Sequence, residues 1–130
     1  MKNSRITASR RPVFLNLTQI QMPVGALTSI GHRLTGVLLA VSVPLCVYLL
    51  DRSLQGQQGF EQVRALLDHG VFKIVVILMI WALAHNLLAG VRHLLTDFNV
   101  GSTLLSARRS AWGVNVAGAA VALLAAAVLL

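Results

Sequence analysis

Residues 74–91 read IVVILMIWALAHNLLAGV and carry no formal charge between Lys73 and Arg92. A helix needs about 20 predominantly apolar residues to cross the hydrocarbon core of a bilayer, and this stretch with its flanks is long enough. Only His85 and Asn86 interrupt its apolar character. The stretch therefore predicts a transmembrane helix.

Two further stretches have the same character. Residues 34–50 are uncharged between Arg33 and Asp51, and residues 110–130 contain no charge at all. Apolar residues make up 56% of the chain and charged residues 12%, and the charges are crowded into short segments. Buried helices of a water-soluble bundle would each show a polar face at helical spacing, and none of the three stretches has one. A soluble bundle is therefore disfavoured.

We predict an all-α fold, an integral membrane protein with three transmembrane helices. At 130 residues the chain is one domain. The predicted parts are an N-terminal cytoplasmic and interfacial segment followed by three spans, over residues 1–27, 28–50, 71–95 and 110–130. Pro44 should bend the first span because it removes a backbone hydrogen bond. The last span is interpreted as plain scaffold.

The basic residues predict the orientation in the membrane. The whole net charge of +7 falls on the N-terminal segment, the start of the first span and the second connection, whereas the first connection, residues 51–73, is neutral. By the positive-inside rule the N-terminus is cytoplasmic, and we expect a bacterial inner membrane. Nucleic-acid binding is not indicated, because residues 1–11 contain no aromatic residues among their basic ones.

Ser29, His32 and Arg33 form one group of polar residues, at the cytoplasmic mouth of the first span. Ser29 and Arg33 are four residues apart and share a helix face. A hydroxyl beside a fixed positive charge can bind a quinone carbonyl and stabilise the negative charge that develops during reduction. The alternative is that Arg33 snorkels to lipid headgroups and Ser29 caps the helix.

A second group, His85, Asn86, Arg92, His93 and Asp97, lies in the second span and at its cytoplasmic end. An imidazole deep in the span could ligate a haem iron, and Arg92 and His93 could neutralise the haem propionates. The alternative is that His85 packs inside the protein with a hydrogen bond. We interpret Asp97 as an interfacial partner of Arg92 or Arg33.

Three motifs resemble the cytochrome b subunit of succinate dehydrogenase. They are Arg11-Pro12-Val13, the SIGHRLTG of residues 29–36 and the GVRHLLTD of residues 90–97. Their order, their spacing and the number of spans agree with that family along nearly the whole chain.

The resemblance implies an anchor that pairs with a second small membrane subunit and seats an iron–sulfur subunit and a flavoprotein subunit on the membrane. Electrons from succinate would reach ubiquinone, and a haem b would lie between the two anchor chains with one axial histidine from each. Ser29 and Arg33 correspond to quinone-site residues, and His32 and His93 to residues near the propionates. No flavin fingerprint or cysteine cluster occurs, so succinate oxidation is assigned to the partners.

One position departs from the family pattern. The haem-ligating histidine of the family falls four residues before the glycine of the Gly-x-Arg-His motif, where this sequence has Asn86. His85 is one residue earlier, a rotation of about 100°, and so shares a face with Arg92. We predict that His85 ligates the iron, since it is the only histidine of the span at suitable depth. The alternative is a haem held only by the partner chain, or none.

Two other functions stay open at this point. A small three-helix transporter, ion-pathway or assembly subunit without haem would also place polar residues inside the membrane. The anchor of a fumarate reductase would share the architecture, and the sequence does not separate the two directions of catalysis.

Overall fold

The computed structural model describes residues 24–100 and 103–130, so the Arg11-Pro12-Val13 motif and nearly all of the predicted interfacial segment lie outside the described part. The described residues form four helices and no strand: α1 Val24–Leu54, α2 Gln57–Asp68, α3 Gly70–Asp97 and α4 Leu104–Leu129. Helices α1, α3 and α4 are long and apolar enough to cross a membrane. The predicted fold class is confirmed.

The three long helices extend past the predicted spans. Helix α4 begins at Leu104, ahead of residue 110, and α3 continues through Arg92 to Asp97. A helix continues into the interfacial region, because charged side chains are tolerated there. A span predicted from an uncharged stretch is therefore shorter than the helix that contains it. The bounds of the membrane-embedded parts stay predictions.

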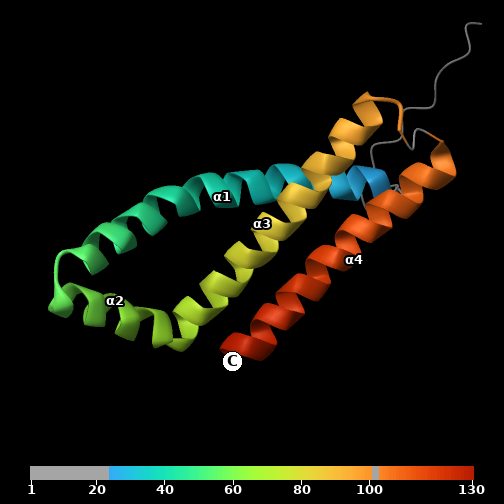
Figure 1. The fold of residues 1–130 in the computed structure, drawn as a ribbon. Helices are drawn as coiled ribbons and strands as arrows, with labels where there is room; N and C mark the ends of the chain where they lie inside the picture. Colours follow the sequence, from blue (N-terminus) through green and yellow to red (C-terminus); the bar gives the residue numbers. More distant parts are fainter. Residues whose placement is uncertain (1–23, 101–102) are drawn as a thin grey trace, which may run out of the picture.

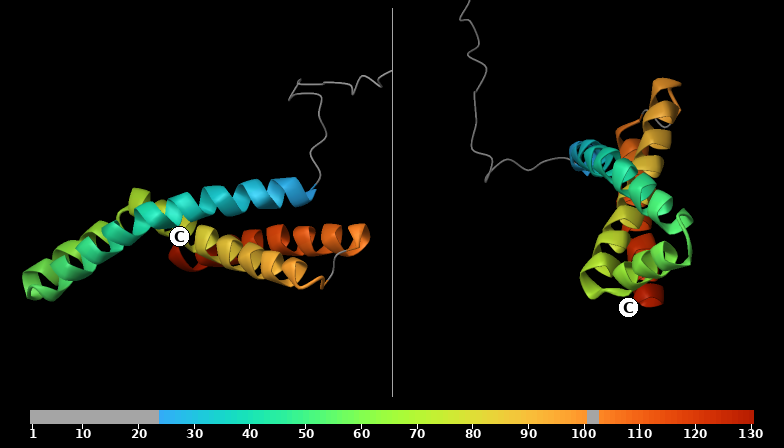
Figure 2. Two further views of the ribbon diagram at one scale, coloured as in Figure 1. Left: turned by 90° about the horizontal axis from the view of Figure 1, so that it is seen from above. Right: turned by 90° about the vertical axis from the view of Figure 1, so that its left-hand side faces the viewer.

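Helices α3 and α4 run antiparallel and side by side, and α1 crosses them near the end where α3 finishes (Figure 1). The starts of α1 and α4 and the finish of α3 lie together at one end of the bundle, which we call the basic end (Figure 2). Several polar and basic residues of the three helices, among them Arg33, Arg92 and Arg109, lie at this end. The C-terminus lies at the opposite end, near α2 (Figure 1).

Small residues occupy the helix interfaces. Ala82 and Ala89 of α3 and Ala111 and Gly118 of α4 are buried, whereas large apolar residues such as Leu83 are exposed on the outside. Lipid tails are as apolar as leucine, so membrane helices gain little by hiding large side chains and associate instead through close backbone approach. The burial pattern is that of a bundle surrounded by lipid.

Helix α1 bends and leaves α3 in its second half (Figure 2). Pro44 lies inside the helix and has no N–H to donate to the carbonyl one turn earlier. Ser42 donates its hydroxyl to the carbonyl of Leu38 at 2.6 Å, a contact that also favours bending. The bend agrees with the prediction made for Pro44.

Helix α2, in the first connection, was not predicted. Gly56 allows the turn that separates it from α1, because its φ of 148° lies in a region that favours glycine. Phe60, Val63 and Leu67 share one face of α2, and Val63 is buried. A short amphipathic helix of this kind suits the membrane surface opposite the basic end.

Candidate functional site

Helix α3 carries four polar residues that form two pairs, each pair on one face of the helix. His85 and Arg92 are seven residues apart, and so are Asn86 and His93, which places the two pairs on faces about 100° apart. The first pair is directed at α4 and the second at α1. The predicted rotation of His85 towards Arg92, and away from His93, is confirmed.

His85 lies at the meeting point of three helices. Its side chain is only 4% exposed, and its Nε2 lies 3.1 Å from Oδ1 of Asn115 on α4. The hydroxyl of Thr28 on α1 lies 3.3 Å from the same oxygen and 2.9 Å from the carbonyl of Val24, and its single proton is shared between these two acceptors. With the amide in this orientation Nε2 carries the proton, and Nδ1 is buried without a hydrogen-bond partner among the described residues. We call His85, Asn115 and Thr28 the core triad.

Two glycines enclose the His85 ring. A Cβ atom built on Gly31 of α1 would lie 2.7 Å from Cε1 of His85, and one on Gly118 of α4 would lie 3.4 Å from its Cβ. The indole of Trp81 lies alongside, with ring centroids 5.6 Å apart. The imidazole therefore fills the space between α1 and α4 in place of two side chains.

Arg92 is bound to α4 by its guanidinium. Nε donates to the hydroxyl of Ser110 at 3.0 Å, and Nη2 donates to the carbonyl of Ala107 at 3.3 Å. Asp97 is exposed, and no ion pair joins it to Arg92 or Arg33 within residues 24–100 and 103–130. The expected partnership is wrong, because five residues along a helix turn Asp97 about 140° away from Arg92.

Asn86 and His93, the second pair, lie where α3 packs against α1. We call this interface the α1–α3 seam. Asn86 donates its amide to the carbonyl of His32 at 3.0 Å and to the hydroxyl of Thr35 at 3.3 Å. The rings of His32 and His93 meet edge to face, with centroids 5.3 Å apart. A Cβ atom on Gly90 would lie 3.7 Å from Nε2 of His32, so the His32 ring packs against the backbone of α3 there.

Ser29 and Arg33 lie one turn apart on α1 at the basic end. Ser29 is half-buried and Arg33 is exposed, whereas Thr28 and Thr35, on the inner side of α1, are fully buried. Neither side chain of the pair forms a hydrogen bond to another described residue. The pair is thus presented outward, close in sequence to His32, on a surface that a partner chain or a ligand could cover.

Sequence reasoning missed the polar residues of α4. The interpretation of this helix as plain scaffold is wrong, because Asn115 completes the core triad and Ser110 accepts from Arg92. The signal was present, since an asparagine in a charge-free apolar stretch is costly unless it has a partner.

The α1–α3 seam fits the edge of a haem better than His85 fits its iron. His32 and His93 offer ring N–H donors suited to propionates. Nε2 of His85, by contrast, contacts Asn115 and would lie 3.2 Å from a Cβ on Gly31, so it has no open approach. Ligation by His85 stays a prediction, and it requires the ring to leave the core triad.

Three membrane-spanning helices with polar side chains gathered at one end define a multi-pass membrane anchor. The family described as the succinate dehydrogenase/fumarate reductase transmembrane subunit matches residues 7–126. The chain belongs to this family.

Individual relatives carry the same description. The succinate dehydrogenase cytochrome b556 subunit of Coxiella burnetii is 38% identical over 109 residues, which cover 83% of this chain and 87% of the relative. The subunits of the same name from Paracoccus denitrificans and Rickettsia typhi are each 28% identical, over 89% and 83% of this chain and 88% and 84% of their own lengths. The chain is thus similar to these subunits over most of its length.

Proposed function

We propose that this chain is the haem b- and quinone-binding anchor subunit of a succinate dehydrogenase and takes part in passing electrons from an iron–sulfur subunit to ubiquinone. Its partners are a second small membrane subunit, the iron–sulfur subunit and a flavoprotein subunit that oxidises succinate. The observation that carries the proposal is the edge-to-face pair of His32 and His93 at the basic end, on the same helix end as Ser29 and Arg33. The name of the relatives, cytochrome b556 subunit, supports the haem.

Ser29 and Arg33 serve the quinone. Reduction places negative charge on a quinone carbonyl oxygen before protons neutralise it. The guanidinium of Arg33 stabilises that charge, and the Ser29 hydroxyl, one turn away, donates a hydrogen bond to the same oxygen. No residue of this chain is assigned to succinate oxidation.

His32 and His93 serve the haem edge. A haem b bound against the α1–α3 seam would supply a one-electron carrier between the iron–sulfur subunit and the quinone. The two imidazoles would donate hydrogen bonds to the propionate carboxylates, and Asn86 holds the backbone of α1 at His32 in register with α3. Arg92, predicted to share this role, faces α4 instead.

The source of the axial ligand has two candidate answers. The family pattern asks for one imidazole from this chain, and His85 is the only described histidine deep in α3. The enclosed packing of His85 favours the second answer, in which the partner chain holds the iron. A histidine introduced by Asn86→His would face the α1–α3 seam, and we expect it to strengthen haem retention if the family register applies here.

The basic end is proposed to face the cytoplasm of a bacterial inner membrane, where the soluble subunits dock. A reporter fused after Leu130 should then read periplasmic, and one inserted within residues 99–109 should read cytoplasmic. The opposite reading at both sites would contradict this orientation.

The proposed function is tested on the purified membrane complex. A b-haem spectrum that becomes reduced on adding succinate, together with quinone reduction, is the expected result. A complex without haem that still reduces quinone would remove the haem from the proposal. A membrane protein that copurifies with no flavoprotein or iron–sulfur subunit would overturn it. The family also includes fumarate reductase anchors, so succinate oxidation must be compared with fumarate reduction at the potential of the native quinone.

A further inference from the structure

A groove of about 390 Å³ separates α3 from α4 at the basic end. It lies on the Arg92 face of α3, about 100° around the helix from the face that carries His93. The proposed quinone and haem residues do not line it. The residues proposed to bind quinone and haem therefore do not explain this groove.

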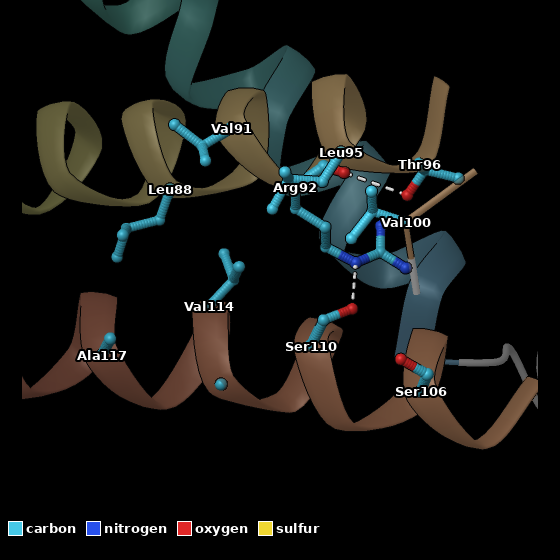
Figure 3. A pocket seen from close by; sticks show the side chains of 11 residues that line it. Leu88, Val91, Arg92, Leu95, Thr96, Val100, Ser106, Ser110, Val114 and Ala117 are labelled. Carbon is cyan, nitrogen blue, oxygen red and sulfur yellow. Dashed lines mark hydrogen bonds between the residues drawn. The ribbon is translucent and has the colours of Figure 1, made fainter. Parts of the chain in front are cut away.

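The lining of the groove is apolar at one end and mixed at the other, where Leu95 and Val100 lie beside Arg92 and Thr96 (Figure 3). Leu88 and Val91 face Val114 and Ala117 in the part furthest from the basic end, and Thr96 and Ser106 lie at the basic end, with Arg92 between the two parts. We call the apolar part the slot, and the part with Arg92, Thr96 and Ser106 the rim. Such a groove suits an amphiphile, with its polar head at the rim and its apolar chain in the slot.

The rim of the groove carries positive charge that pairs with no described carboxylate, although Asp97 follows Thr96 at the end of α3. Arg92 uses Nε and Nη2 on Ser110 and Ala107, which leaves Nη1 available, and no carboxylate pairs with it within the described residues. Arg108 and Arg109 add two cations on the same end of α4. The start of α4 adds the positive end of its helix dipole. The head of the occupant should therefore be anionic.

We propose that this groove binds one anionic phospholipid of the surrounding bilayer. Its phosphodiester lies against the Arg92 guanidinium and the hydroxyls of the rim, because arginine presents several N–H donors in a planar fork that suits phosphate oxygens. One acyl chain lies between Leu88 and Val114. The apolar slot is what selects a lipid over free phosphate. The proposal does not depend on the function proposed above.

The first test measures lipid retained by the assembled complex. The complex is exchanged into detergent with equal amounts of phosphatidylglycerol and phosphatidylcholine, washed, and weighed by native mass spectrometry. We expect selective retention of phosphatidylglycerol, reduced about fivefold by Arg92→Gln, the size expected for one basic residue near an anionic lipid. Arg108→Gln, which removes an equal charge outside the lining, is the matched control and should reduce retention much less than Arg92→Gln does. Equal losses in both variants, or equal retention of the two lipids, would overturn the proposal.

The second test fills the slot and leaves Arg92 intact. A Cβ atom on Gly113, which lines the groove, meets nothing within 4 Å, so the side chain of Gly113→Leu starts without a clash and extends into the slot. We expect this variant to assemble normally and to lose the retained phosphatidylglycerol. Full retention would overturn the proposal. So would displacement of the lipid by millimolar inorganic phosphate, because that result would mean that the head alone is bound.

Discussion

The two polar faces of α3 differ in where their hydrogen bonds go. On the face towards α4, His85 and Arg92 have partners within this chain, at 3.1 Å and 3.0 Å. On the face towards α1, Asn86 joins the two helices, but the His32 and His93 rings contact each other edge to face and make no side-chain hydrogen bond to another described residue. His85, Arg92 and Asn86 thus hold the bundle together, whereas His93, the residue after Arg92, remains available to a ligand together with His32.

The difference teaches how to read polar residues in a membrane helix. A buried polar group in lipid is retained when it has a partner, and that partner is either another helix or a cofactor. His85 has the first kind of partner, enclosed by Gly31 and Gly118. His32 and His93 are placed for the second kind. Substitutions on the two faces should therefore have different consequences, the first for stability and the second for electron transfer.

The largest effect should come from the outer face of α1. Arg33→Leu and Ser29→Ala should each lower quinone reduction, Arg33→Leu by about 100-fold, because a donor aimed at developing charge in a dry site is worth several kcal/mol. Succinate oxidation with an artificial soluble acceptor should stay nearly unchanged, since that reaction lies in the partner subunits. Wild-type quinone kinetics in both variants would mean that Ser29 only caps the helix and that Arg33 only extends to the lipid headgroups.

The next effect concerns the packing of His85. Gly31→Ala places a methyl group 2.7 Å from Cε1 of an enclosed ring, so we expect a loss of about 1–3 kcal/mol in the free energy of unfolding of the assembled complex. Gly113→Ala, whose Cβ meets nothing within 4 Å, is the control. The double variant Gly31→Ala/His85→Ala should recover part of the loss, because the clash is removed. Equal stability of the two glycine variants would contradict the enclosed position of His85.

The smallest effect should come from the weakest bond of the core triad. Thr28→Val keeps the shape of the side chain and removes the hydroxyl, with its hydrogen bonds to Asn115 of α4 and to the carbonyl of Val24 within α1. Interhelical hydrogen bonds in membranes average about 0.6 kcal/mol, so a loss near that size is expected, with an unchanged haem spectrum. Ser42→Ala, which removes a bond within α1 only, serves for comparison. A loss of several kcal/mol at Thr28 would mean that the triad contributes more than packing.

Much of the fold followed from the sequence, because charges and uncharged stretches alone determine which segments can enter a membrane. The rotation of His85 relative to Asn86 also followed, since helical spacing fixes it. The hydrogen-bond partners of the polar residues could not be predicted from the sequence. Asn115 was not expected to meet His85, because which helix faces which depends on the packing of small residues such as Gly31 and Gly118. Helix α2 was missed because its apolar face is short and lies among charged residues.

The separation of the two faces is tested most directly by the haem spectrum of two variants in the assembled complex, His85→Ala and Asn115→Ala. Both break the core triad, and only the first removes an imidazole. If His85 belongs to the packing of the bundle, the two variants keep the same b-haem signal and the same haem content per complex as the wild type. Loss of that signal in His85→Ala alone would contradict the account and make His85 the axial ligand.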